Sequence, residues 1–184
     1  MMSRRWALNH ARLLLKRDVE KANHYFETFE APPRDGDIYL IRFLRTLLDF
    51  RKQGVLSKEA EGRIVHFLTE WSPRVPVNDR TSKKYWPPNH TENHDLMQLT
   101  LGLFALQYRK EDAANQVKDL KQFIAERFKY GFAEFNSRCY QYHFTNPLII
   151  LADYAPDENL KLAAKQLLDI LFAGNYSGGL EGRI

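Results

Sequence analysis

The fold class is decided by the stretch Asp37-Ile38-Tyr39-Leu40-Ile41-Arg42-Phe43-Leu44-Arg45-Thr46-Leu47-Leu48, whose apolar residues recur at helical spacing. The apolar side chains that we expect on one buried helix face are Ile38, Ile41, Leu44 and Leu48. Asp37 is a good N-cap, and Gly54 stands where a C-terminal cap glycine belongs. This stretch therefore predicts an amphipathic helix.

The same spacing recurs along almost the whole chain, and no segment of useful length alternates apolar with polar residues as a half-buried strand does. The predicted class is all-α. Besides the helix at Asp37, we expect helices at about residues 5–29, 57–71, 91–108 and 111–130, one that holds 148–152, and one from 157 to Gly174. Asn146-Pro147 would cap the sixth of these seven helices or lie in its first turn. The glycine-rich tail, residues 174–184, is expected to be flexible and not helical.

Length and composition narrow the organisation of the chain. With 184 residues, 44% hydrophobic, we expect a single helical domain over residues 1–184. The formal charge of +4 is spread without a dense basic block, so no nucleic acid partner is implied, and the basic residues of the first helix are interpreted as a solvated face. A single cysteine, Cys139, excludes an internal disulfide framework and a multi-cysteine metal site.

Targeting signals are not evident in the sequence. No run approaches the ~18 apolar residues that a membrane span needs, and we expect no membrane partner. Asn9, His10 and Arg12 interrupt what would be the apolar core of a signal peptide, so none is predicted.

About seven helices joined mostly by short turns predict antiparallel helical hairpins, and no repeat of fixed period is present. The exception is a long, proline-rich, polar loop at residues 72–90. Loops of that length inside compact domains are uncommon and often functional. Its adjacent aromatic residues, Tyr85 and Trp86, are candidates for stacking on a sugar ring or, equally, for plugging the core.

Two junctions between loops and helices gather residues that can do chemistry. The first is His90-Thr91-Glu92-Asn93-His94-Asp95, where two histidines stand four apart, as metal ligands do on a helix. The metalloprotease pattern is absent and no third ligand is evident, so we predict no metal and no cofactor, and a capping cluster is the plainer interpretation.

The second junction runs from Glu134 to His143 and carries Asn136, Ser137, Arg138, Tyr140 and Tyr142. It has more hydrogen-bonding groups than its own helix caps require. The alternative is structural: the tyrosines would pack between helices, and Asn136 or Ser137 would serve as a cap.

These segments, with Leu151 to Asp157 and the closing glycines near Arg183, resemble a poorly characterised group of bacterial (α/α)-toroid proteins. The resemblance covers roughly residues 86–183. Its most specific parts are Glu-Asn-His at 92–94 and Glu-Phe-Asn-Ser-x-x-Tyr at 134–140. More distantly, an Asn-His pair followed by a Tyr on a later hairpin is similar to the active sites of toroid polysaccharide lyases.

The resemblance implies an acidic polysaccharide or oligosaccharide as partner and a cleft on the toroid. The residues expected to bind substrate are Tyr85, Trp86, Glu92, Glu134, Asn136, Arg138 and Arg183. In β-elimination, Asn93 would hold the uronate carboxylate, His94 would be the base, and Tyr140 the acid or base.

Two alternatives stay open at this point. A glycoside hydrolase would use a carboxyl pair among Glu92, Asp95 and Glu134, and a noncatalytic helical scaffold would bind protein or sugar through the same surface. About three and a half hairpins are fewer than a closed toroid needs. The expectation is therefore either that these residues are a fragment of a longer toroid or that a partner domain or a second copy completes it.

Overall fold

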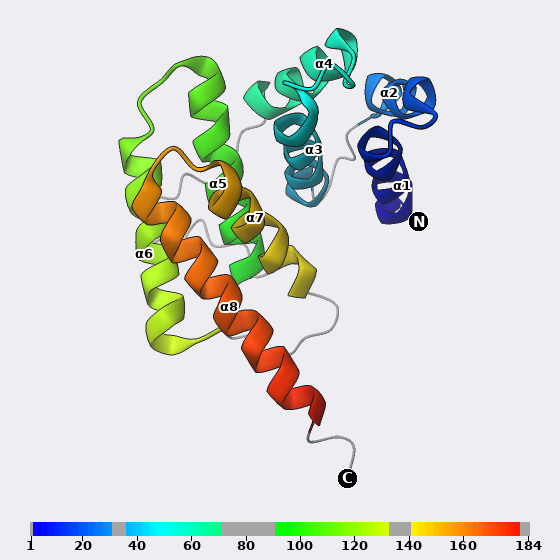
Figure 1. Cartoon of the computed structure of the whole chain (residues 1–184). Helices are drawn as coiled ribbons and strands as arrows, with labels where there is room; N and C mark the ends of the chain where they lie inside the picture. Colours follow the sequence, from blue (N-terminus) through cyan, green and yellow to red (C-terminus); the bar gives the residue numbers. More distant parts are fainter. Residues whose placement is uncertain (1, 31–35, 71–90, 133–140, 181–184) are drawn as a thin grey trace. The chain divides into compact units, whose positions relative to one another are not determined.

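The computed structural model describes residues 2–30, 36–70, 91–132 and 141–180 (Figure 1). In these ranges the chain forms eight α-helices and no strand, which confirms the all-α class. The chain divides into two compact units, Met1–Ser72 and Pro73–Ile184. The prediction of a single domain stays a prediction, as does the toroid arrangement. The predicted loop at 72–90 lies outside the described residues.

The first unit contains α1 (Met2–Leu14), α2 (Val19–Thr28), α3 (Gly36–Phe50) and α4 (Lys58–Glu70). Helix α2 packs on α1 and α4, and α3 packs on α4. Aromatic rings form the centre of this unit, with Phe43 lying 5.3 Å from Phe26 and 4.4 Å from Phe29 between ring centroids. Edge-to-face geometry in both pairs is the arrangement that aromatic rings favour.

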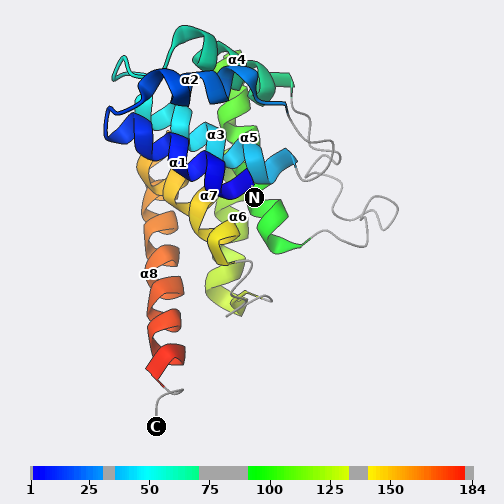
Figure 2. The same ribbon diagram turned by 90° about the vertical axis from the view of Figure 1, so that its right-hand side faces the viewer.

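The expected single helix over residues 5–29 is wrong, because the chain folds back between α1 and α2 (Figure 2). Lys16 and Asp18 have positive φ angles of 52° and 49°, which no continuous right-handed helix allows. The turn lets Leu13 and Ala22 both be buried, while Leu15, which a continuous apolar face would have covered, is 66% exposed. Helical spacing alone does not distinguish a long helix from a hairpin of two shorter ones.

The helix predicted from Asp37 is confirmed as α3, with Ile41 and Leu44 buried and Ile38 and Leu48 partly so. It ends at Phe50, and Gly54 lies in the following turn. Gly54 has a φ of 67°, in the left-handed region that favours glycine, as expected for a residue that ends a helix. Ser57 then caps α4, since its Oγ accepts a hydrogen bond of 3.1 Å from the backbone N–H of Ala60.

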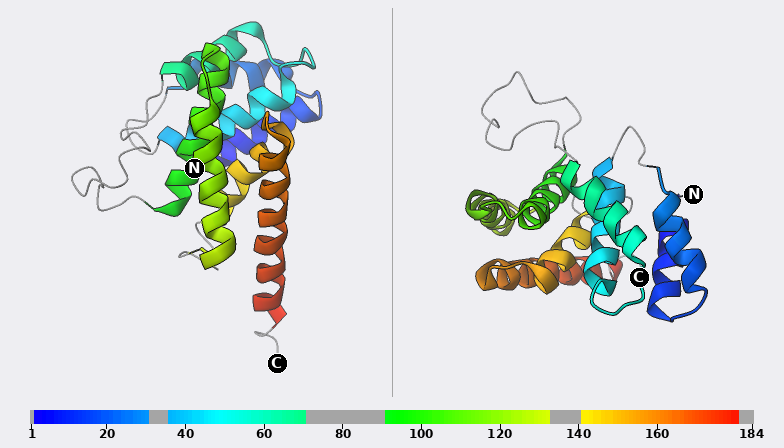
Figure 3. Two further views of the ribbon diagram at one scale, coloured as in Figure 1. Left: turned by 90° about the vertical axis from the view of Figure 1, so that its left-hand side faces the viewer. Right: turned by 90° about the horizontal axis from the view of Figure 1, so that it is seen from above.

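The second unit contains α5 (Glu92–Arg109), α6 (Ala114–Tyr130), α7 (Gln141–Tyr154) and α8 (Glu158–Leu180). Helices α5 and α6 form one hairpin and α7 and α8 another, with α5 beside α7 and α6 beside α8 (Figure 3). The hairpins are stacked in the same direction, so α5 and α7 begin at the same end of the unit (Figure 1). Leucine is the commonest residue of the buried core, which includes Leu96, Leu99, Leu103, Leu120, Leu148, Leu151, Leu160 and Leu167.

Two predicted features of the second unit are corrected. Pro147 lies inside α7 and not in its first turn, because the helix already begins at Gln141. Helix α8 continues past Gly174 to Leu180, so the expected non-helical tail is wrong for residues 174–180. A glycine costs a helix only about 1 kcal/mol, and no proline follows Gly174 to stop the helix. None of the described helices is long and apolar enough to cross a membrane.

Candidate functional site

The first predicted junction forms the amino end of α5. Thr91 is the N-cap residue, in an extended conformation, and its carbonyl accepts the first helical hydrogen bond from the N–H of Asp95. The Thr91 hydroxyl donates to Oδ1 of Asn93. Thr91 thus holds the Asn93 amide through its oxygen atom and leaves the amide nitrogen for another partner.

Asn93 is 1% exposed, and its buried Nδ2 has no hydrogen-bond partner among the residues that the structure describes. Most buried polar atoms are hydrogen-bonded, because an unsatisfied donor costs about 1–3 kcal/mol. The first turn of a helix also carries free backbone N–H groups and the positive end of the helix dipole. A ligand oxygen accepting from Nδ2 would therefore be favoured both by the amide and by the helix.

Glu92 forms an ion pair with Arg127, which comes from the last turn of α6. Both side chains are mostly buried, at 22% and 13% exposed. The Arg127 guanidinium also lies 3.8 Å from Glu126 and 5.2 Å from the centre of the Phe123 ring. This arrangement fixes the first residue of α5 to the neighbouring helix of its own hairpin.

Arg127 is the residue at this site that sequence reasoning missed. The signal was the hairpin itself: when α5 and α6 are antiparallel, the first turn of α5 faces the last turn of α6. An arginine in that last turn is then within reach of an acidic residue in the first turn. The spacing of residues within one helix does not reveal a contact of this kind between two helices.

The other members of the first junction are partly exposed. His94 and Asp95 follow Asn93 on α5, and both have interaction partners. His90 lies outside the described residues. Among the residues that are described, no group of three or more histidine, cysteine or acidic side chains is placed to hold a metal ion.

Most of the predicted substrate-binding residues and one catalytic candidate lie outside the described residues. These are Tyr85, Trp86, Glu134, Asn136, Arg138, Tyr140 and Arg183. The second junction resumes with α7, whose first turn holds Tyr142, 43% exposed, and His143, 5% exposed. Because α5 and α7 begin at the same end of the unit, the described parts of both predicted junctions lie at that end.

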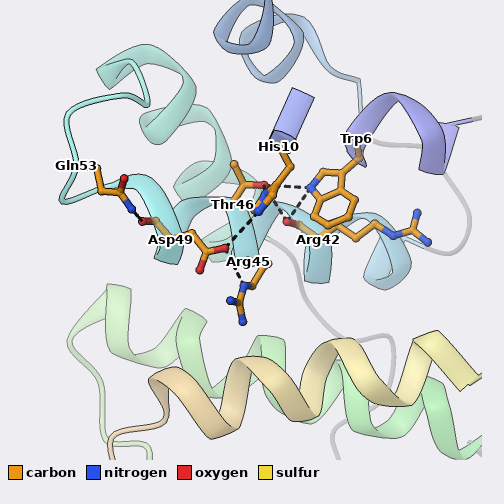
Figure 4. A network of polar contacts seen from close by, with 7 residues as sticks. All are labelled: Trp6, His10, Arg42, Arg45, Thr46, Asp49 and Gln53. Carbon is orange, nitrogen blue, oxygen red and sulfur yellow. Dashed lines mark hydrogen bonds and ion pairs between the residues drawn. The ribbon is translucent and has the colours of Figure 1, made fainter. Parts of the chain in front are cut away.

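A second polar cluster connects α1 and α3 in the first unit (Figure 4). His10 Nδ1 lies 3.0 Å from Thr46 Oγ1, and His10 Nε2 lies 3.4 Å from Asp49 Oδ2. The indole N–H of Trp6 donates to Thr46 Oγ1 and to the carbonyl of Arg42, both at 3.0 Å. Arg45 completes the cluster by donating to Asp49 at 2.8 Å.

The order Asp49, His10, Thr46 is the order of groups that activates a hydroxyl nucleophile in hydrolases. Thr46, however, is fully buried, and its hydroxyl is already engaged, because it donates to the carbonyl of Arg42 at 3.2 Å. Its oxygen is also occupied by the Trp6 indole. The cluster satisfies polar groups between two packed helices and is structural.

Comparison with models of known protein families, with curated proteins and with solved structures finds no match for this chain.

Proposed function

We propose that this chain is a carbohydrate-active helical domain of the (α/α)-toroid type that cleaves uronate-containing polysaccharides by β-elimination at the amino end of α5. The observation that carries the proposal is the buried Asn93 amide nitrogen, which has no hydrogen-bond acceptor within the described ranges of the chain. A uronate carboxylate supplies acceptors of the right kind. The residue pattern at 92–94 and 134–140 supports the same proposal from the sequence.

β-Elimination needs a group that stabilises negative charge on the substrate carboxylate. Removal of the proton from the neighbouring carbon delocalises an electron pair into that carboxylate. A neutral amide donor in the first turn of a helix, as Asn93 is, stabilises this charge without adding a titrating group. The burial of Asn93 strengthens the interaction, because little water competes for the donor.

His94 and Tyr140 would move the protons. His94, the next residue on α5, would take the proton from the carbon beside the carboxylate. The electron pair left behind forms a carbon–carbon double bond as the glycosidic carbon–oxygen bond breaks. Tyr140 directly precedes α7 in the sequence and would give a proton to the departing oxygen. The products are an unsaturated uronate end and a sugar with a free hydroxyl.

The hydrolase alternative has less support. It requires a carboxyl pair among Glu92, Asp95 and Glu134, but the Glu92 carboxylate is already bound by Arg127. A noncatalytic domain that binds the same sugars would use Asn93 in the same way. Only product formation distinguishes it from a lyase.

The test is a panel of uronate-containing and neutral polysaccharides, followed by the ultraviolet absorbance of the unsaturated product and by the appearance of reducing ends. We expect absorbance with an acidic polymer and its loss in His94→Ala and Tyr140→Phe. Matched controls are His66→Ala and Tyr130→Phe, which change exposed residues of the same types and should keep the activity. Reducing ends without absorbance would favour a hydrolase, and no product from any polymer would contradict catalysis.

A further inference from the structure

We propose that Arg127 is a specificity-determining residue: by neutralising Glu92, it makes the amino end of α5 accept an acidic sugar in preference to a neutral one. This inference rests on the proposed function but concerns a residue that the sequence pattern does not include. The contact that carries it is the ion pair between Arg127 on α6 and Glu92, the residue next to Asn93.

The charge at this end of α5 explains why neutralisation matters. The first turn holds two acidic residues, Glu92 and Asp95, beside the Asn93 donor. A uronate carboxylate that accepts from Asn93 Nδ2 would share the first turn of α5 with the Glu92 carboxylate. Two like charges in a poorly hydrated site repel strongly, because the attenuation by water is reduced there. Pairing Glu92 with a guanidinium removes this repulsion.

The surroundings of Arg127 fix it in that position. Its side chain is 13% exposed, the guanidinium lies over the Phe123 ring, and Glu126 approaches from its own helix. A planar guanidinium can stack on a ring while it donates to carboxylates, which a lysine ammonium cannot do in the same way. We therefore expect Lys at this position to replace Arg127 only in part.

The second observation at this helix end is independent of the ion pair. Asn93 is 1% exposed, and no described residue accepts a hydrogen bond from its buried Nδ2. The helix is 18 residues long, so its amino end carries a full dipole contribution. Together, the free donor, the helix end and the neutralised glutamate favour an anion at a place where two acidic side chains would otherwise exclude it.

The experiment measures binding of trisaccharides by titration calorimetry in the full chain, with His94→Ala as background so that no turnover occurs. The probes are galacturonate and guluronate trisaccharides and, for comparison, a neutral trisaccharide of the same length. Arg127→Gln should weaken binding of the acidic probe at least tenfold, which corresponds to about 1.4 kcal/mol, and leave binding of the neutral probe unchanged. Glu92→Gln should tighten binding of the acidic probe.

The decisive variant is the double substitution Glu92→Gln with Arg127→Gln. If Arg127 acts by neutralising Glu92, removing both charges restores acidic binding to within about threefold of the parent; a role in folding alone gives no such rescue. The matched control is Lys121→Gln, which removes another cation of α6 that pairs with an acid, namely Asp157 directly before α8, at 2.8 Å. Acidic binding should not change in this control.

The failures of the two proposals differ. A parent protein that binds an acidic probe, with Arg127→Gln equally tight or with no rescue in the double variant, contradicts the role of Arg127 and leaves the proposed function standing. Equal binding of neutral and acidic probes by the parent also contradicts it. A parent that binds none of the probes contradicts both proposals.

Discussion

Two buried asparagines of this chain differ in how their amides are satisfied. Asn23 donates from Nδ2 to the carbonyl of Val55 at 3.0 Å and accepts at Oδ1 from the N–H of Ser57 at 2.9 Å. Asn93 accepts a hydrogen bond from Thr91, but its Nδ2 has no acceptor in the part of the chain that the structure describes. The first amide ties the loop before α4 to α2, whereas the second retains an unused donor in the first turn of α5.

This difference predicts opposite responses to the same substitution. Asn23→Leu should lower the free energy of unfolding by at least about 2 kcal/mol, because it leaves two backbone groups unsatisfied. Asn93→Leu should stay within about 1 kcal/mol of wild type or above it, because it also removes an unsatisfied donor. Urea denaturation of both variants checks this, and a larger loss for Asn93→Leu than for Asn23→Leu would contradict it.

Thr46 offers a comparable test in the polar cluster. Its hydroxyl accepts from Trp6 and lies 3.0 Å from His10, so Thr46→Val removes a partner from two side chains. We expect a loss of about 1–3 kcal/mol in the free energy of unfolding. The control is Thr100→Val: Thr100 is also fully buried, but its hydroxyl donates only to the Leu96 carbonyl one turn earlier. Equal losses in urea denaturation would mean that the cluster contributes nothing beyond packing.

At the scale of secondary structure, two glycines that have space for a side chain have opposite roles. Neither has a heavy atom within 4 Å of an added Cβ, but Gly54 has a φ of 67° and Gly62 lies inside α4. Gly54→Ala should destabilise the protein by about 1 kcal/mol, because alanine is strained in that conformation. Gly62→Ala should stabilise it by about 0.5–1 kcal/mol, because alanine is the better helix former. Thermal unfolding shifts of the same sign in both variants would contradict this assignment.

The start of α8 makes stability depend on pH. A hydrogen bond from Lys121 and the N-cap bond from the Leu160 backbone hold the pKa of Asp157 below its usual value of 3.8. Because the pKa is lower in the folded state, the stabilisation is complete above about pH 4 and is lost as the pH falls through the folded value.

Asp157→Asn keeps a capping oxygen but removes this titration. We therefore expect Asp157→Asn to be less stable than wild type at pH 7 and to approach it below pH 3. Lys121→Gln should reduce the same pH-dependent difference, since it removes the largest cause of the lowered pKa. Chemical denaturation at pH 7 and pH 2.5 measures the free energy of unfolding of each variant. The same difference between wild type and Asp157→Asn at both pH values would exclude Asp157 as the source of the pH dependence.

The sequence predicted the helices well where a capping residue marks the helix end. Ser57 and Asp157 stand at the predicted starts of two helices and cap them as α4 and α8. Leu160, Leu167, Leu168 and Leu171 of α8 are buried at helical spacing, whereas Leu162 is exposed. The sequence pattern failed where a helix boundary depends on contacts between residues far apart in the chain. The turn at Lys16–Asp18 has no proline or glycine, and only packing of α1 against α2 explains it. Pro147 likewise sits inside α7, where its ring and missing N–H normally oppose a helix.

At the scale of the whole molecule, the chain consists of two helical units, each with its own buried core. The first unit holds the structural polar cluster, and the second holds the amino ends of α5 and α7, where the chemistry-bearing junctions were predicted. Sequence reasoning identified Glu92, Asn93 and His94 as candidates because packing does not demand them. It did not identify Arg127, because the contact with Glu92 exists only once α5 and α6 fold back on one another.

The central claim is that the Asn93 amide donates to the carboxylate of a uronate. The most direct measurement follows the side-chain amide signals of ¹⁵N-labelled protein by NMR while a uronate trisaccharide is added, with the Asn93 signals identified by their absence in Asn93→Leu. We predict a downfield shift and slower hydrogen exchange for Asn93, with the already satisfied Asn23 unchanged. The claim would be contradicted if a uronate trisaccharide bound without changing the chemical shifts of the Asn93 amide, or if no uronate trisaccharide bound.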